Sequence, residues 1–151
     1  MKSKSIKESQ VIMHELVLPN DTNVLGNVHG GRVMCLMDIC AAMSAYKHAR
    51  SAVVTASVDQ LDFLAPAKKG DILILKSSVN YVRTTSMEIG VRIDAEDPFT
   101  GELKHTATSY LTFVAIDDKN KPFALFDYII YNGFILPTKP FFRINQNQDH
   151  I

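Results

Sequence analysis

One stretch constrains the fold of this chain more than any other: residues 33–45 read VMCLMDICAAMSA, and Asp38 is the only charged side chain among them. A pair of glycines precedes the stretch, and the basic segment 47–50 follows it, as is typical of a helix C-terminus. The pattern predicts a helix over residues 30–48. A helix that is apolar on all sides is normally buried, and burying an unpaired carboxylate is costly. Asp38 is therefore either held by hydrogen bonds in a structural role or kept for chemistry.

Length and charge narrow the class of protein. The 151 residues suggest one domain with a single core, and 16 basic side chains balance 16 acidic ones. Because nucleic-acid-binding domains are usually basic, this balance argues against a nucleic-acid partner. No segment reaches the roughly 18 apolar residues that cross a bilayer, so we expect no membrane contact. Residues 1–9 are polar and basic with no apolar segment after them, which predicts a frayed terminus instead of a secretory signal.

The cysteines and histidines point to a reducing compartment and away from metal binding. Cys35 and Cys40 share the predicted helix, about 140° apart around its axis, so they are not expected to pair with each other. We expect two buried, reduced thiols and hence a cytoplasmic protein. The five histidines are scattered without the spacing of metal ligands, so no metal site is expected.

Most of the remaining chain alternates like half-buried strands. The alternation is clearest where Met87, Ile89 and Val91 exchange with polar or small residues. One apolar helix followed by a strand meander has a simple physical solution, an α+β fold whose sheet curls around the helix. A small sheet of this kind keeps an open edge, so we expect two copies to pair there. The predicted strands cover residues 10–18, 52–63, 72–83, 86–95 and 104–116.

The pattern changes after Pro122. Residues 123–142 are rich in aromatic side chains and follow neither a helical nor a strand period, so no fold is predicted for them. A packed extension, an oligomer contact and a poorly folded tail all remain open. The expected organisation is a frayed segment 1–9, a domain over residues 10–122 and an atypical aromatic-rich tail over 123–151.

Seven short segments carry the chain's motifs. They are residues 23–31 (NVLGNVHGG), 37–38 (MD), 54–59 (VTASVD), 63–66 (FLAP), 70–71 (GD), 85–88 (TSME) and 107–114 (ATSYLTFV). In this order they resemble the acyl-CoA thioesterases of the hotdog fold, within them the cytosolic acyl-CoA hydrolase branch. The resemblance runs from about residue 9 to Pro122, after which the aromatic tail departs from the charged helical segment that tends to end this branch.

The resemblance implies both a fold and a substrate. The hotdog fold is a curved antiparallel β-sheet wrapped around one long central apolar helix. The implied substrate is an acyl thioester of coenzyme A, and no cofactor beyond that coenzyme A is needed. The active site is expected in a groove at a homodimer interface, and dimers of this family commonly assemble further into trimers of dimers.

Five residues are candidates for the hydrolytic site, two of them, Asp38 and Asn23, through the resemblance. Asp38 becomes the general base on water or the nucleophile, the alternative being a structural carboxylate that accepts amides of a neighbouring loop. Gly30 and Gly31 stand where the helix should begin, so an amide there, preferably that of Gly31, can stabilise an oxyanion, unless the pair only forms a turn. Asn23 matches the family's catalytic asparagine and is expected to face Asp38 of the partner subunit. Thr55 can add a hydroxyl near the same carboxylate. Turn chemistry at Asn23 and plain strand propensity at Thr55 are the alternatives.

Coenzyme A is assigned to a predicted turn between strands. There Arg83, Thr85 and Ser86 offer a cation and hydroxyls that can hold phosphate or pantetheine, although such turn residues are often merely solvated.

Two other functions stay open. A hotdog dehydratase or hydratase would use a histidine such as His29 with Asp38, but the His-Phe-Pro-Gly style loop of acyl-carrier-protein dehydratases is missing. A non-catalytic acyl-CoA-binding protein usually needs an output domain, for which this chain offers no room.

Overall fold

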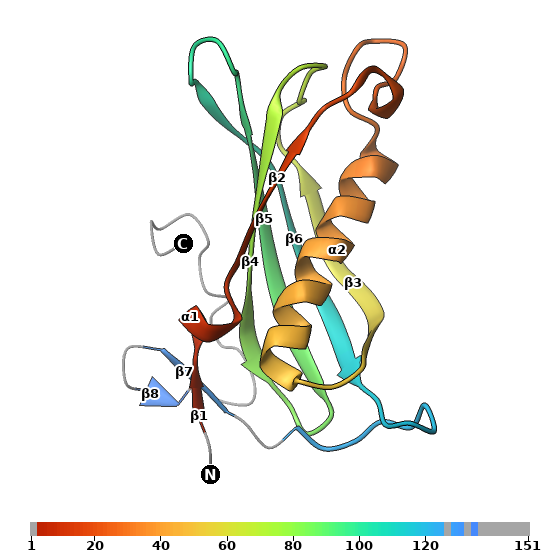
Figure 1. The fold of residues 1–151 in the computed structure, drawn as a ribbon, viewed down its shortest axis with the longest axis vertical. Coiled ribbons are helices and arrows are strands. Elements are labelled where there is room, and N and C mark those ends of the chain that lie inside the picture. Colours follow the sequence, from red (N-terminus) through yellow and green to blue (C-terminus); the bar gives the residue numbers. More distant parts are fainter. Residues whose placement is uncertain (1–2, 126–127, 132–133, 136–151) are drawn as a thin grey trace.

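The computed structural model describes residues 3–125, 128–131 and 134–135, and its main body is a five-stranded antiparallel sheet crossed by one long helix (Figure 1). The strand order is β2-β4-β5-β6-β3, so β2 and β3 are the edges. A smaller sheet pairs β7 with β1 in parallel and with β8 in antiparallel direction. The elements are β1 (Ser3–Ser5), α1 (Ile6–Ser9), β2 (Val11–Leu16), the 3₁₀ turn η1 (Pro19–Asp21), α2 (Gly30–Ala49), β3 (Val53–Phe63), β4 (Ile72–Val82), β5 (Ser86–Glu96), β6 (Leu103–Ala115), β7 (Tyr128–Tyr131) and β8 (Phe134–Ile135).

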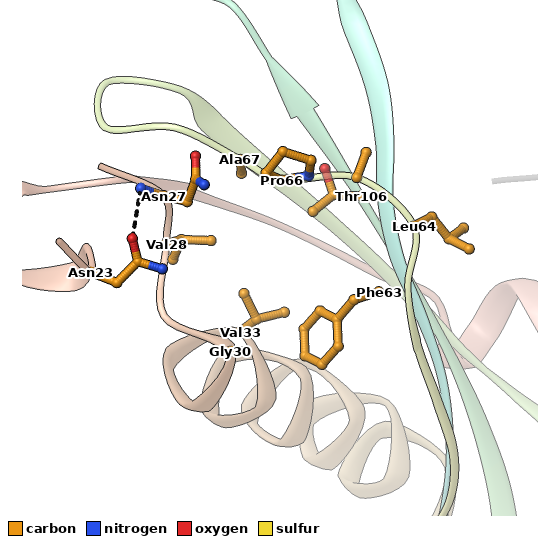
Figure 2. Close-up of a pocket in the computed structure, with 11 residues that line it drawn as sticks. Asn23, Asn27, Val28, Gly30, Val33, Phe63, Leu64, Pro66, Ala67 and Thr106 are labelled. Atoms are coloured by element: carbon orange, nitrogen blue, oxygen red, sulfur yellow. Dashed lines mark hydrogen bonds between the residues drawn. The ribbon is translucent and has the colours of Figure 1, made fainter. Parts of the chain in front are cut away.

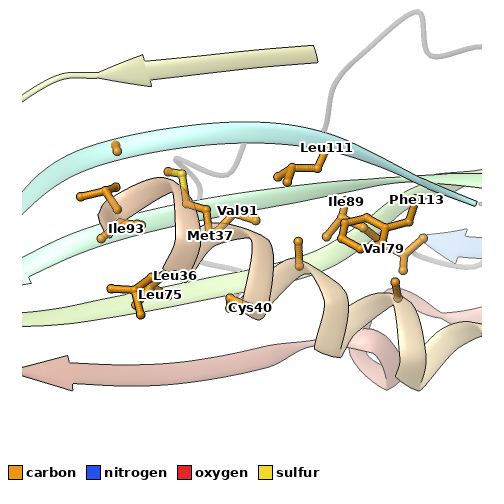
Figure 3. Packing of buried hydrophobic residues seen from close by; sticks show 14 of the residues in the cluster. Leu36, Met37, Cys40, Leu75, Val79, Ile89, Val91, Ile93, Leu111 and Phe113 are labelled. Atoms are coloured by element: carbon orange, nitrogen blue, oxygen red, sulfur yellow. The ribbon is translucent and has the colours of Figure 1, made fainter. Parts of the chain in front are cut away.

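The core lies between α2 and one face of the sheet (Figure 3). In β5, Met87, Ile89 and Ile93 are each at most 1% exposed, and they meet Met37 and Cys40 from the helix. Because side chains alternate across a strand, the intervening residues of β5 face away from the helix. This arrangement confirms the predicted fold class, an α+β hotdog fold with its sheet around one central apolar helix.

A buried hydroxyl cluster fixes how α2 lies on β4. Ser77 Oγ donates to the Cys40 carbonyl oxygen at 2.8 Å, and Ser44 Oγ lies 2.6 Å from the same hydroxyl. The Cys40 Sγ lies 3.2 Å from that hydroxyl as well. Since buried polar groups need partners, this pairing favours one position of the helix along the strand. Burial raises the pKa of the Cys40 thiol, which keeps it protonated within the cluster.

The predicted frayed segment over residues 1–9 is wrong for the part of it that the structure describes. Lys4 Nζ donates to the His48 carbonyl oxygen at 2.6 Å, at the C-terminal end of α2. The Ser9 side chain is buried, and its Oγ accepts the Val79 amide of β4 at 3.0 Å. These partners are 44 and 70 residues away along the chain. No local pattern could predict them.

One side of α2 and most of β3 are not covered by the described part of the chain. Beyond Val53, nearly every residue of β3 is exposed, as expected for an edge strand that lacks its neighbour. Cys35 is exposed too, so the prediction of two buried thiols is wrong for this one. The angle between the two cysteines turns Cys35 to the uncovered side of the helix. We call this uncovered apolar surface the α2–β3 face; its large side chains are Met34, Ile39, Tyr46 and Val58, each 43–50% exposed.

The segment left without a predicted fold is described in part. Within residues 123–142, β7 and β8 join β1 in the small sheet, and the other residues of the segment from 126 onward lie outside the described part. Among the described residues, no helix is both long and apolar enough to cross a membrane.

Candidate active site

The carboxylate in the apolar helix is held by a single hydroxyl. Thr55 Oγ1, near the start of β3, donates a hydrogen bond of 2.6 Å to Asp38 Oδ1, in the middle of α2. Asp38 is only partly buried. Within the described residues no backbone amide donates to Asp38, and its second carboxylate oxygen has no hydrogen-bond partner. The fold therefore does not show the structural alternative, a carboxylate tied down by loop amides, and it leaves one oxygen open to a ligand.

The N-terminus of α2 offers amide donors. His29 is the N-cap residue, but its side chain makes no capping hydrogen bond. Val33 is bonded back to the His29 carbonyl at 3.1 Å, whereas the amides of residues 30–32 have no acceptor in the described part of the chain. Around Gly31, an added Cβ would meet nothing within 4 Å. Unpaired amides and the positive end of the helix dipole together favour an anion at this point.

The oxygen of the Asn23 side-chain amide is bonded within its loop, whereas the nitrogen is not. Its Oδ1 accepts the amides of Leu25 at 2.9 Å and Asn27 at 3.2 Å, which is the turn chemistry expected of asparagine. Its Nδ2 makes no hydrogen bond to any residue that the structure describes. Both sequence interpretations of Asn23 therefore describe a part of the same side chain: the oxygen shapes the loop, and the amino group remains free to donate.

Asn23 and Gly30 line a cleft of about 400 Å³ at the N-terminal end of α2 (Figure 2). The Phe63 ring points from the end of β3 toward the first turn of the helix. Asp38 and Thr55 do not line this cleft, so in the described part of a single chain Asp38 and Asn23 do not share it. The lining residues are Asn23, Asn27, Val28, Gly30, Val33, Phe63, Leu64, Ala65, Pro66, Ala67 and Thr106.

Two residues near the cleft could not be singled out from the sequence. Phe63 belongs to the FLAP segment, one of the motifs quoted for the family resemblance, but its role depends on which element it faces. Arg32, in the first turn of α2, lies 2.6 Å from Glu15 of β2 and 3.0 Å from Asp21 of η1. This double ion pair ties the loop that carries Asn23 to the helix N-terminus. Ionic pairing over such separations has no signature in the sequence.

The residues predicted for coenzyme A lie at the turn between β4 and β5, and two of the three come together. Arg83 and Ser86 line a second cavity of about 340 Å³, whereas Thr85 does not. The Arg83 guanidinium lies 5.6 Å from the centre of the Tyr81 ring, and Ser86 is on the face of β5 that points away from α2. The other lining residues are Asp59, Tyr81, Met87, Glu88 and Thr112.

None of the histidines that the structure describes is bonded to Asp38. His105, on β6, is bonded to Thr108 at 2.7 Å; burial and then the charge of Arg92 hold its pKa below 6.5. His29 makes no hydrogen bond to Asp38 in the described structure. Among the described residues, no group of three or more His, Cys, Asp or Glu side chains could hold a metal ion.

Comparison with known proteins identifies the family. The sequence model of the thioesterase superfamily matches residues 25–101. YkhA of Bacillus subtilis, named an uncharacterized acyl-CoA thioester hydrolase, is 43% identical over 121 residues, which cover 80% of this chain and 70% of that protein. The chain belongs to the thioesterase superfamily.

Solved structures of acyl-CoA thioesterases share the fold. An apo, hexameric acyl-CoA thioesterase matches with a TM-score of 0.84 at 43% identity, over 86% of this chain and 83% of that one. An acyl-CoA hydrolase from Staphylococcus aureus, in complex with butyryl coenzyme A and coenzyme A, matches with a TM-score of 0.79 at 44% identity, over 86% of this chain and 80% of that one. Further structures of this hydrolase carry alanine in place of an aspartate, an asparagine or a threonine. The resemblance seen in the sequence motifs is thus confirmed.

Proposed function

We propose that this member of the thioesterase superfamily hydrolyses acyl-CoA thioesters to the free acid and coenzyme A. The observation that carries the proposal is the pair formed by Asp38 and Thr55, a partly exposed carboxylate with one oxygen held and the other open. A carboxylate so placed can act on water or on a carbonyl carbon. The names of YkhA and of the S. aureus hydrolase support acyl-CoA as the substrate.

In the proposed reaction Asp38 either activates water or attacks the thioester carbonyl itself. By the water route, Asp38 accepts a proton while the water oxygen bonds to the carbonyl carbon and an oxyanion forms. The carbon–sulfur bond then breaks, and the proton passes to the departing thiolate. The Thr55 hydroxyl restrains the carboxylate throughout, because a hydrogen bond to a charged group is stronger than one between neutral groups.

The oxyanion needs preorganised donors, and the helix N-terminus with Asn23 supplies candidates. A glycine inside a helix is about 0.5–1 kcal/mol less favourable than alanine. Nothing in the described chain requires this at Gly31, where a Cβ would find open space. Close approach of a ligand accounts for it, so we assign the Gly31 amide, with that of Gly30 beside it, to the oxyanion. The free Nδ2 of Asn23 is the second donor.

A dimer brings the separated parts together. Asn23 lines the cleft and Asp38 does not, and β3 is an exposed edge strand next to the apolar side of α2. Pairing of two such edges buries the α2–β3 face, because exposed strand edges and apolar patches favour association. We propose that Asp38 and Thr55 of one chain then face the partner's Asn23. Hexamers among the similar structures support further assembly into a trimer of dimers.

The replaced residues of the S. aureus hydrolase support the site. An asparagine, an aspartate and a threonine were changed singly to alanine there, and they follow one another at separations of 15 and 17 residues. Asn23, Asp38 and Thr55 follow one another at the same separations. The same three residue types in the same spacing, in chains more than 40% identical, support equivalent positions.

Coenzyme A binding at Arg83, Thr85 and Ser86 remains part of the proposal. Arg83 and Ser86 share a polar cavity, which supports a contact between the guanidinium and a phosphate. Asp59 and Glu88 line the same cavity, so a phosphate is expected on the side of Arg83 only. We also retain as proposals a cytoplasmic location and the absence of any cofactor beyond the substrate's own coenzyme A.

Thiol release from acetyl-, hexanoyl- and palmitoyl-CoA tests the function, with Asp38→Asn as the variant and Asp118→Asn, at an exposed turn, as the matched control. Asparagine has nearly the same shape but cannot act as a base. We expect the wild type and the control to release thiol, and Asp38→Asn to lose about a hundredfold or more in kcat with an unchanged fold. A folded wild type that releases no thiol from any acyl-CoA would sink the enzymatic proposal and leave a binding protein.

A further inference from the structure

The cleft beside Asn23 combines an apolar interior with a polar rim. The side chains of Val33 and Phe63 line its interior, and the free amino group of Asn23 lies at its rim. The backbone amides on the side of the cleft away from the helix are already used. Leu64 donates to the Thr106 carbonyl at 2.8 Å, as does Ala65 at 3.3 Å, and Val28 donates to the Ala67 carbonyl at 2.9 Å. These walls thus offer contact area without backbone donors, and free donors stand only beside them, at the Gly30 amide and the Asn23 amino group of the described lining.

We propose that this cleft binds the acyl chain of the substrate and that Phe63 sets the length of chain it accepts. The inference rests on the proposed function, because Asn23 at the rim is the donor assigned to the thioester oxygen. An alkyl chain needs apolar contact alone. The pantetheine arm carries amides and a hydroxyl, whose burial without partners is costly. The lining therefore suits the acyl side of the thioester and not the coenzyme A side.

Phe63 closes the cleft on the helix side. Its ring Cζ is 3.5 Å from where a Cβ on Gly30 would stand, which is ordinary contact distance. A side chain larger than a methyl group at residue 30 would push the ring away, so Gly30 and Phe63 together set the wall. Phe63 is nevertheless 53% exposed, as is most of the edge strand β3. A shorter side chain at this position would lengthen the cavity toward Val33.

The position of Phe63 at the helix side of the cleft favours short and medium chains. About 400 Å³ is near the lower end of the range of small-molecule sites. We expect kcat/KM of the wild type to rise about fourfold with each methylene that the cleft buries. Once the chain reaches Phe63 the rise stops, so hexanoyl-CoA is preferred to palmitoyl-CoA.

The test compares Phe63→Ala and Phe63→Leu with the wild type on acetyl-, hexanoyl-, decanoyl- and palmitoyl-CoA. Phe99→Ala is the matched control, since Phe99 is 95% exposed in the hairpin between β5 and β6. We expect Phe63→Ala to raise the palmitoyl-to-hexanoyl ratio of kcat/KM by at least about fourfold, the effect of one buried methylene. Phe63→Leu should shift the ratio less, and Phe99→Ala should leave it unchanged.

Each possible result of this comparison either supports the inference or overturns it. A chain-length profile that is the same in the wild type and both Phe63 variants overturns the inference. An equal loss of kcat/KM for every acyl chain length in both Phe63 variants, with thermal midpoint and light scattering unchanged, also overturns the inference. Failure of the proposed function is a different result, in which the wild type hydrolyses no acyl-CoA. Calorimetric affinities for hexanoyl- and palmitoyl-CoA then test the cleft alone, and a preference that Phe63→Ala does not alter overturns it.

Discussion

Thr55 donates a hydrogen bond of 2.6 Å to Asp38, and this contact joins the start of an edge strand to the middle of a helix. Both residues are accessible beside the α2–β3 face. The carboxylate is therefore oriented by one donor and faces the surface at which a second chain is expected. A purely structural aspartate would use both oxygens within its own chain.

Replacing Thr55 by valine separates shape from hydrogen bonding, because valine keeps the branched side chain and loses the donor. Hydrogen bonds to charged groups contribute about 1.5–3 kcal/mol, so we expect kcat to fall about tenfold to a hundredfold. Thr55→Ser keeps a hydroxyl and should retain most of the activity. Thiol release measured at saturating substrate checks this, and a valine variant as fast as the wild type would contradict the role of Thr55.

Asn23→Asp tests the division of labour within one side chain. Aspartate can still accept the amides of Leu25 and Asn27, so the loop should keep its shape. It lacks the amino group, and loss of one oxyanion donor typically costs about a hundredfold to a thousandfold in kcat. We expect a fall of that size with little change in KM. A rise in KM with kcat unchanged would instead assign Asn23 to substrate binding.

Mixed dimers test whether the site is shared between chains. Asp38→Asn and Asn23→Asp should each be nearly inactive alone, but a dimer containing one of each has one site with both native residues. Co-expression in equal amounts should therefore restore about a quarter of the wild-type activity, given two-fold symmetry and random pairing. Activity no higher than that of the separate variants would place both residues in the same chain's site.

The stability of the fold should depend on His105 as the pH falls. Burial and the charge of Arg92 keep its pKa in the folded state below 6.5, so the unfolded chain binds the proton first. Stability is fully present above pH 6.5 and is lost as the pH falls through that value toward the folded pKa. His105→Gln should lose less in thermal midpoint between pH 7 and pH 5, the range in which histidine titrates. The exposed His14→Gln serves as control, and equal losses in both variants and the wild type would contradict this reading.

Local periodicity explains why most of the fold could be predicted. The apolar run around Asp38 predicted a helix over residues 30–48, and α2 covers Gly30–Ala49. Alternation of apolar and polar residues predicted strands close to the observed β2 to β6, because successive side chains of a half-buried strand face the core and the solvent in turn. For the same reason Asp38 could be singled out, because a lone carboxylate in an apolar helix is visible without any coordinates.

The sequence by itself therefore determined α2 and the strands β2 to β6, the wrapped-sheet fold, the family and the candidate residues Asp38, Asn23 and Gly31. The tertiary structure alone decided which residues distant in the sequence are in contact. It showed that Thr55 reaches Asp38, that Phe63 stands against Gly30, and that residues 3–9 dock on α2 and β4. The physical reason is the distance along the chain over which each interaction acts. Backbone propensity and burial period act over a few neighbouring residues, whereas these contacts join residues 17 to 70 positions apart, and only the packed chain brings them together.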